Sequence, residues 1–219
     1  TGAQQKLAPG EYELATGMSA LSVIDAIVVK PDSPVYRLTF PEGIRIEEMA
    51  EIVEASGFAT AEEFLAAVER AQLPPGLAEY LPPDDTLPPG QRLQGYLFPD
   101  TYLMPEGSTV DDLVALMIET LDERFTPELR AAAAEKGLNP HQALTLASIV
   151  EREAVIPEER PLIAGVFLNR LRANDLLGAD PTVQFAVALD PEIVARFGWW
   201  KKELTIDDLE IQSPYNTRL

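Results

Sequence analysis

The spacing of apolar side chains divides the first third of the chain into strands and helices. Residues 35–40, Val-Tyr-Arg-Leu-Thr-Phe, alternate apolar and polar side chains, as a strand with one buried face does. Residues 11–14 show the same alternation after a Pro-Gly turn. Apolar residues at helical spacing predict helices over residues 19–28, 46–55 and 60–68. A strand, helix, strand, helix order packs as a small two-layer α/β unit.

The pattern changes after a segment that is rich in proline. Paired prolines gather between residues 74 and 89, where we expect a rigid connection, and residues 97–100 are expected to form an extended turn. The rest of the chain is predicted to be mainly helical, with helices over residues 109–124, 127–136, 139–155, 158–173, 180–188 and 205–210. We therefore expect an α+β chain, with a small α/β domain and its connection over residues 1–88 and a helical domain over residues 89–219.

Composition is that of an ordinary globular protein and excludes several kinds of function. The chain is 46% hydrophobic, and its 36 acidic against 17 basic residues give a net charge of −19. Nucleic acid is therefore not an expected partner, because phosphate binding needs a basic surface. The absence of cysteine excludes disulfides, thiolate catalysis and cysteine metal sites. The sequence has no apolar run long enough to cross a bilayer, and it suggests neither a metal nor an organic cofactor.

A carboxylate interrupts the apolar side of the helix predicted over residues 139–155. A step of about 100° per residue places Glu151, in the stretch "ASIVEREA", on one side with Leu144, Ala147, Ala154 and Val155. The opposite, more polar side carries Thr145, Ser148, Arg152 and Glu153. An ionised carboxylate is costly in apolar surroundings, so we expect Glu151 either to hold its proton or to pair with a cation.

The residues alone leave two interpretations of Glu151 open. A glutamic acid that stays protonated near neutral pH can donate its proton to a glycosidic oxygen. Alternatively, Glu151 is a structural residue paired with a buried arginine, for which Arg170 or Arg172 on the next helix would serve. Other catalytic chemistry is poorly represented, because the one histidine, His141, lies at a helix start and the common nucleophile, phosphate-loop and metalloprotease motifs are missing.

Several aromatic and polar stretches suit either a sugar contact or the fold. In "GYLFPDTY" (residues 95–102), aromatic faces can stack on sugar rings or can pin the loop to the core. Asp180, before Pro181, can bind a ligand or cap a helix. The stretch "SPYNT" (residues 213–217) is similarly ambiguous, and the two tryptophans at 199 and 200 are either exposed contacts or loop anchors.

Taken in this order, the segments resemble the MltG (YceG-like) endolytic murein transglycosylase family. The motifs that carry the resemblance cover nearly the whole chain and are "LAPGEYELATGMSALSVIDAI", "LTFPEGIRIEEMAEIV", "LQGYLFPDTY", "LASIVEREA", "VFLNRL", "DPTVQFA" and "SPYNTRL". The resemblance implies a LysM-like N-terminal domain and a catalytic transglycosylase domain. It also implies cleavage between N-acetylmuramic acid and N-acetylglucosamine within peptidoglycan strands, which leaves 1,6-anhydromuramyl ends.

The resemblance implies roles for particular residues. The family's catalytic glutamate lies in the S-I-V-E-x-E motif and maps onto Glu151, as general acid and then base. The positions expected to line the glycan cleft are Tyr96, Asp100, Asp180, Thr182, Tyr215 and Asn216. Glu153 and Asn169 are expected to support them from behind, and no metal or cofactor is implied. The resemblance favours the catalytic interpretation of Glu151, with a non-catalytic peptidoglycan-binding module as the alternative function.

The sequence departs from the family pattern in three places. Gln94 stands where members commonly have glutamate. The family pattern continues after Tyr-Asn-Thr into a further loop and sheet, so we expect the catalytic domain to be truncated at its C-terminus. The family's membrane anchor is also missing, which implies a soluble part of a protein anchored in the inner membrane and facing the cell envelope. Its implied partners are glycan strands, with the cell-wall synthesis machinery left open as a second.

Overall fold

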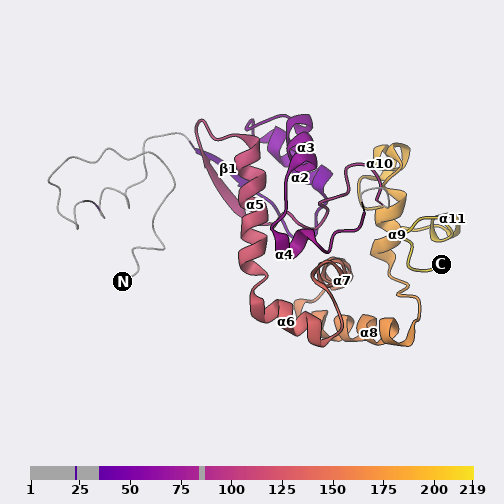
Figure 1. The fold of residues 1–219 in the computed structure, drawn as a ribbon. Coiled ribbons are helices and arrows are strands. Elements are labelled where there is room, and N and C mark those ends of the chain that lie inside the picture. Colours follow the sequence, from indigo (N-terminus) through magenta and orange to yellow (C-terminus); the bar gives the residue numbers. More distant parts are fainter. Residues whose placement is uncertain (1–22, 24–34, 84–86) are drawn as a thin grey trace.

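A computed structural model describes residue 23, residues 35–83 and residues 87–219 (Figure 1). The strand predicted at residues 11–14 lies outside the described residues, as does the helix predicted at residues 19–28 apart from residue 23. The described elements follow in the order β1 (Val35–Thr39), α2 (Ile46–Ala55), α3 (Ala61–Arg70), α4 (Pro75–Ala78), β2 (Thr101–Pro105), α5 (Val110–Arg124), α6 (Pro127–Glu135), α7 (Pro140–Glu153), η3 (Pro157–Glu159), α8 (Arg160–Ala173), α9 (Asp180–Val187), α10 (Pro191–Phe197) and α11 (Ile206–Leu209). The chain is therefore mostly helical with a small sheet.

The sheet joins strands from the two sides of the proline-rich segment. β1 pairs with β2 in antiparallel register, with Leu38 opposite Tyr102 and Thr39 opposite Thr101. The hydroxyl oxygens of Thr39 and Thr101 lie 3.0 Å apart. The sequence pattern predicted β1 correctly but missed β2, although Tyr102 and Met104 alternate inward in it. Among the described residues, the strand that pairs with β1 therefore lies after the proline-rich segment in the sequence.

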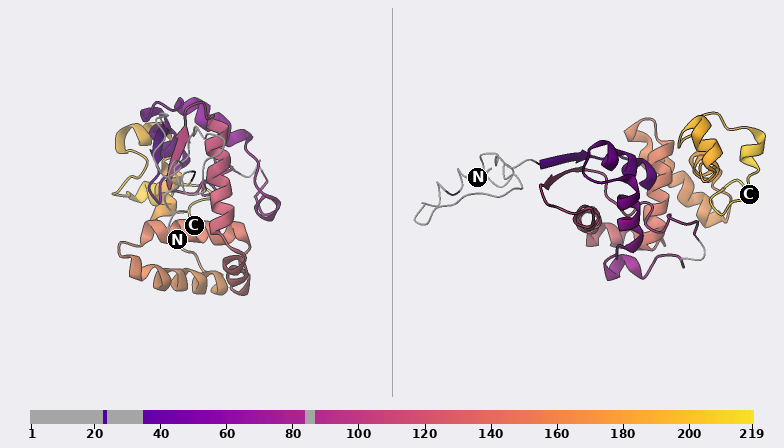
Figure 2. Two further views of the ribbon diagram at one scale, coloured as in Figure 1. Left: turned by 90° about the vertical axis from the view of Figure 1, so that its left-hand side faces the viewer. Right: turned by 90° about the horizontal axis from the view of Figure 1, so that it is seen from above.

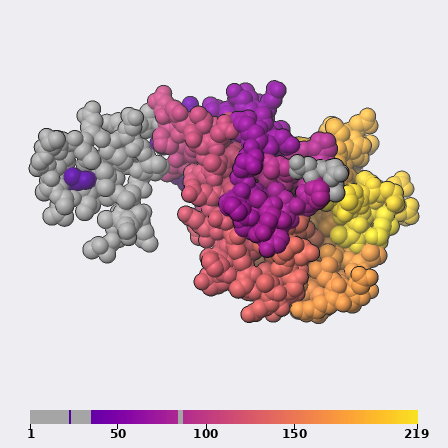
Figure 3. Space-filling view, viewed as in Figure 1, coloured from indigo at the N-terminus to yellow at the C-terminus, as the bar shows by residue number. Residues whose placement is uncertain are grey.

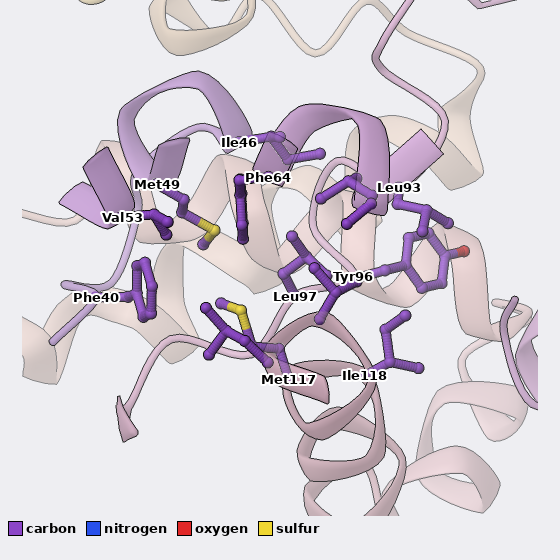
Figure 4. Packing of buried hydrophobic residues seen from close by; sticks show 14 of the residues in the cluster. Phe40, Ile46, Met49, Val53, Phe64, Leu93, Tyr96, Leu97, Met117 and Ile118 are labelled. Atoms are coloured by element: carbon purple, nitrogen blue, oxygen red, sulfur yellow. The ribbon is translucent and has the colours of Figure 1, made fainter. Parts of the chain in front are cut away.

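The main hydrophobic core lies between the sheet and three helices. Capping boxes begin two of these helices, at Thr60 for α3 and at Thr109 for α5. Apolar side chains then recur at helical spacing and pack together (Figure 4), among them Ile46, Met49 and Val53 of α2, Phe64 and Val68 of α3, and Leu113, Met117 and Leu121 of α5. This core includes residues on both sides of position 88. The domain boundary at 88 and the LysM-like fold stay predictions.

In the second half of the chain, α7 lies among the other long helices. Figure 1 shows α5 along one side of the molecule, α6 and α8 at the base and α9 on the other side, with α7 seen almost end-on between them. α7 packs against α6, α8 and α9. A smaller hydrophobic cluster forms there from Leu146, Ile149 and Val150 of α7 together with Phe167 and Ala179. Leu144 of α7 packs instead against the main core, so α7 contacts both clusters.

The helices predicted from residue 46 onward are confirmed with small shifts at their ends, and two short helices were missed. α4 lies inside the segment predicted as a connection, and α10 follows a residue pattern, Asp190-Pro191-Glu192, that resembles a helix start. Both are too short to show a clear apolar period. No helix in the described ranges combines the length and apolar character that crossing a membrane requires.

A buried arginine connects the start of α2 to the C-terminal helices, which lie at the end of the molecule opposite β1 (Figures 1 and 2). Arg45 is 1% exposed, and its Nη1 donates to the Phe185 carbonyl oxygen over 3.1 Å. Its guanidinium lies 4.1 Å from the Phe185 ring centroid, and its Nε lies 3.2 Å from a Glu47 carboxylate oxygen. The segment that contains α2 and the C-terminal helices form one continuous surface (Figure 3). Arg45 thus donates to acceptors in α2 and in α9 at once.

Trp199 and Trp200 attach the loop after α10 to α2. Trp200 Nε1 donates to Glu48 over 2.8 Å, and Trp199 Nε1 donates to Glu51 over 2.8 Å. The interpretation of these tryptophans as loop anchors is therefore confirmed.

Replacing Arg45 by methionine should destabilise the protein by about 1.5–3 kcal/mol, because the Phe185 carbonyl and Glu47 would lose a charged donor. Urea unfolding measures the difference. The matched control is Arg37→Met, which removes an exposed arginine of β1 and should change the unfolding free energy by less than about 0.5 kcal/mol. Equal unfolding midpoints for the two variants would contradict this role of Arg45.

Candidate active site

The candidate site is at the C-terminal end of α7, where Glu151 lies at the edge of the buried face. Asn139 caps the helix by accepting from the backbone N–H of Gln142 over 2.9 Å. The buried residues of α7 are Leu146, Ile149 and Val150, and the Glu151 side chain beside them keeps 29% of its surface exposed. Glu151 is therefore close to the apolar cluster and still open to solvent on one side.

The apolar side predicted for this helix is confirmed at Leu144, which packs against the main core, but is wrong at Ala147 and Val155. Ala147 is exposed, and Val155 is 91% exposed beyond the end of the helix. The reason is that α8 packs against Leu146, Ile149 and Val150. These three residues lie on a different side of the helix from Glu151. Glu151 consequently has exposed small side chains one turn before it rather than a packed wall.

A salt bridge holds the Glu151 carboxylate, and its partner is not the arginine expected. Arg160 Nη2, at the start of α8, donates to Glu151 Oε1 over 2.9 Å. The same nitrogen lies 3.7 Å from Glu42 Oε2. Arg170 and Arg172, the partners suggested by the sequence, are engaged elsewhere, by the Leu177 carbonyl and by Asn169. The helix spacing gave no sign of Arg160, because η3 and the preceding turn separate it from α7.

The loop after β1 rests directly on α7 at this point. Gly43 has φ of +74°, and a Cβ added to it would lie 3.5 Å from Glu151 Cγ and 3.3 Å from Arg152 Cδ. Arg152 Nη1 donates to the Gly43 carbonyl oxygen over 3.3 Å, and its guanidinium lies 3.8 Å from the Trp200 ring centroid. These contacts place the loop as one wall beside Glu151. Nothing local in the sequence marks this long-range contact.

A hollow of about 240 Å³ opens on the other side of the helix end, between α7, α8 and residue 178. It is lined by Glu153, Ile163, Val166, Phe167, Arg170 and Gly178. Burial raises the pKa of Glu153 above its ordinary value of 4.5, and the nearby charge of Asp180 raises it further. The backbone N–H of Asp180 and the charges of Arg218 and Arg170 oppose this shift. Glu153 therefore keeps its proton to a higher pH than a free glutamate does.

Four of the predicted site residues come together where the C-terminal segment meets α9. Asp180 is exposed at the first turn of α9, and its carboxylate accepts from Arg218. The Thr182 hydroxyl donates to the Ala179 carbonyl and lies 2.9 Å from the Thr217 hydroxyl. The Tyr215 ring packs edge-on against Phe185 at 4.8 Å, and burial raises the pKa of Tyr215. Asn216 is buried, and its side-chain nitrogen donates to the carbonyls of Leu209 and Ile211.

The remaining predicted residues lie apart from these. Tyr96 is 1% exposed in the main core (Figure 4), and its hydroxyl is 2.9 Å from His141 Nδ1 in the first turn of α7. Burial raises the pKa of Tyr96 to about 12 and lowers that of His141. Asp100, before β2, accepts from the Thr101 backbone, and the exposed Asn169 accepts from Arg172. Tyr96 thus supports the start of α7.

Gln94 has a structural contact that the sequence did not suggest. Its Oε1 accepts a hydrogen bond from the Ile46 backbone N–H over 3.1 Å, at the first residue of α2. A glutamate at this position would also offer a side-chain oxygen to the Ile46 N–H. Glutamine in place of the glutamate expected from the resemblance therefore preserves this hydrogen bond.

The chain is similar to a known protein family, to proteins of named activity and to a solved structure. The sequence model of the YceG-like family matches residues 1–219. Two curated relatives are endolytic murein transglycosylases, one from Streptococcus pneumoniae D39, 32% identical over 96% of this chain and 40% of the relative, and one from Bacillus subtilis 168, 28% identical over 95% and 56%. A crystal structure of a yceG-like protein from Listeria monocytogenes has a TM-score of 0.66 and 27% identity over 97% of this chain and 68% of that one. The chain thus spans only 40% to 56% of the length of these curated relatives.

Replacing Gly43 by alanine should disturb the wall beside Glu151. Its φ of +74° would cost an alanine about 1–2 kcal/mol, and the added Cβ would press on Arg152. The matched control is Gly57→Ala, because Gly57 has φ of +73° and a Cβ there would meet nothing within 4 Å. Urea unfolding should show a loss in both variants, whereas tryptophan fluorescence of the folded protein should change only in Gly43→Ala, through Arg152 and Trp200. Identical spectra would contradict the contact.

Replacing Glu153 by glutamine should make the protein relatively more stable above about pH 4.5. Because the pKa of Glu153 is raised in the folded state, the folded protein binds more protons than the unfolded chain between 4.5 and the raised pKa. The wild type therefore loses stability as the pH rises through that window, and the glutamine variant does not. Urea unfolding at pH 4 and pH 7 measures the difference in unfolding free energy between the two proteins. A wild type whose stability rises relative to the variant as the pH rises would refute the prediction.

Proposed function

Because the chain belongs to the YceG-like family, whose model matches residues 1–219, we propose that the full-length protein is an endolytic peptidoglycan transglycosylase. It cleaves the bond between N-acetylmuramic acid and N-acetylglucosamine within glycan strands and leaves 1,6-anhydromuramyl ends. The relatives from Streptococcus pneumoniae and Bacillus subtilis, which are endolytic murein transglycosylases, support the activity. The observation that carries the chemistry is Glu151, a partly exposed carboxyl at the edge of an apolar cluster and beside the Gly43 loop.

In the first step, protonated Glu151 acts as general acid. Its proton passes to the glycosidic oxygen, and the bond between that oxygen and C1 of the muramic acid breaks with its electron pair going to the oxygen. The N-acetylglucosamine side leaves with a free hydroxyl. The positive charge that develops at C1 is stabilised by the N-acetyl group of the substrate itself.

In the second step, Glu151, now a carboxylate, acts as general base. It removes the proton from the 6-hydroxyl of the same muramic acid, and that oxygen bonds to C1. The glutamic acid is regenerated and no water is consumed. One carboxyl is sufficient because the nucleophile belongs to the substrate, which separates this scheme from glycosidases with two carboxylates. The exposed Ala147 and Ser148, one turn before Glu151, leave this approach open.

The other predicted residues divide by exposure. Asp180 has an exposed carboxylate and Tyr215 a half-buried ring, so these two are proposed to contact the glycan directly. Asp100 is also exposed, and a contact there would require the glycan to reach the sheet. Three buried residues are proposed to hold α7, α9 and the C-terminal segment in place, namely Tyr96, Thr182 and Asn216. Glu153 is proposed to support α7, and Asn169 is proposed to support α8.

Its proposed location follows from its proposed substrate. Glycan strands lie outside the cytoplasmic membrane, so the protein is proposed to work in the cell envelope at the outer face of that membrane. An anchor in the inner membrane and a partnership with the cell-wall synthesis machinery belong to the same proposal.

Replacing Glu151 by glutamine should lower the rate of strand cleavage by about 10²- to 10⁴-fold, because general acid–base catalysis contributes this much. The full-length protein is incubated with purified glycan strands, and mass spectrometry counts the anhydromuramyl ends. Glu123→Gln, which changes an exposed glutamate of α5, serves as the matched control and should cleave as the wild type does.

Three outcomes would contradict the proposal. Unchanged yield from Glu151→Gln would remove Glu151 from the chemistry. New reducing ends in place of anhydro ends would indicate a hydrolytic muramidase. Binding to insoluble murein without cleavage by either protein would leave only a peptidoglycan-binding module.

A further inference from the structure

Arg160 lies between two carboxylates that come from different parts of the chain. Its Nη2 donates to Glu151 Oε1 at the end of α7 over 2.9 Å and lies 3.7 Å from Glu42 Oε2 in the loop after β1. Arg160 itself begins α8. Three separate segments therefore meet at one guanidinium beside the proposed acid, and the Arg160 side chain as a whole is 40% exposed.

Few other groups hold this guanidinium. Arg160 Nε is buried, and it has no hydrogen-bond partner among the residues that the structure describes. Arg130 provides a contrast, because its guanidinium donates to the backbone carbonyls of Phe125 and Gly76 and to Asp122. The position of the Arg160 guanidinium is thus set mainly by the two carboxylates that share it.

The other arginine beside Glu151 is already occupied. Arg152 donates to the Gly43 carbonyl and stacks on Trp200, so it fixes the loop rather than the Glu151 carboxylate. Glu153 faces the hollow on the other side of the helix end. Among the described residues, Arg160 is therefore the cation that donates directly to the Glu151 carboxylate.

We propose that Arg160 is a positioning residue that follows the charge of Glu151 during catalysis. The inference rests on the proposed function, in which Glu151 is neutral before it gives its proton to the glycosidic oxygen and negative until it takes one from the 6-hydroxyl. Arg160 binds the carboxylate through Nη2 in the negative state and stabilises it. In the neutral state of Glu151, the Arg160 guanidinium turns to Glu42, which lies within its reach. The protonated oxygen of Glu151 is then free to donate to the substrate.

This assignment separates catalysis from binding. Glu151 keeps its place on α7 without Arg160, because the helix packs through Leu146, Ile149 and Val150 and the Gly43 loop supports its side chain. In the proposed cycle, removal of the Arg160 charge destabilises the carboxylate that Glu151 forms between its two proton transfers, while the glycan is already bound. The turnover number should therefore fall while the Michaelis constant for glycan strands stays the same.

The test uses Arg160→Gln and Arg160→Lys in the full-length protein, with kinetics on purified glycan strands. The glutamine variant should lose about 10- to 100-fold in kcat, as expected for a hydrogen bond to a charged group, with KM unchanged. The lysine variant keeps the charge and should recover part of the loss. Arg70→Gln is the matched control, since it removes the exposed Arg70–Asp111 ion pair on α3 and α5 and should leave kcat unchanged.

The outcomes separate this inference from the proposed function. A wild type that forms no anhydro ends contradicts the proposed function. A wild type that cleaves, together with an Arg160→Gln variant of unchanged kcat, contradicts the role of Arg160 alone. A variant whose loss of activity is matched by a raised KM and a lowered melting temperature, without recovery in Arg160→Lys, shows that Arg160 merely attaches α8 to α7 and also overturns the inference.

Discussion

The close approach of Gly43 to α7 is the constraint on which the geometry of the site depends. Gly43 has φ of +74° and no side chain, and a Cβ added there would lie only 3.5 Å from Glu151 Cγ and 3.3 Å from Arg152 Cδ. Arg152 then closes the contact from the other side by donating to the Gly43 carbonyl and stacking on Trp200. Because Trp200 also donates to Glu48, the same few groups join α2, α7 and the loop after α10. The surroundings of Glu151 are thus built from parts of the chain that are distant in sequence.

The surroundings of Glu151 differ from those of an isolated buried acid. The carboxyl lies at the boundary between a small apolar cluster and solvent, and a guanidinium from α8 pairs with it. In the proposed cycle, Arg160 pairs with Glu151 when Glu151 is negative and with Glu42 when Glu151 is neutral. An acid that must give a proton and then take one needs both states to be accessible, and a cation shared with Glu42 suits that requirement better than a wholly apolar pocket would.

Local patterns predicted most of the helices but not the contacts between them. The helices from α5 to α9 and the strand β1 follow from apolar periodicity and from capping residues such as Asn139. The strand β2 was missed because its five residues include a proline and follow an aromatic turn, and its pairing with β1 spans the proline-rich segment. The faces of α7 were mispredicted because the packing of α8, rather than the average apolarity around Glu151, determines which side is buried. Gly43 and Gln94 make contacts across long sequence separations, and a turn and η3 separate Arg160 from Glu151, so no periodic pattern predicts these contacts.

In the proposed reaction, a single glutamic acid gives one proton to the leaving oxygen and then recovers one from the substrate, with no water taking part. Digestion of glycan strands in water labelled with oxygen-18 tests this directly. The new muramic acid ends should contain no label, because the oxygen that bonds to C1 comes from the sugar's own 6-hydroxyl. One labelled oxygen for each bond cleaved would mean that water is the nucleophile, and would contradict it.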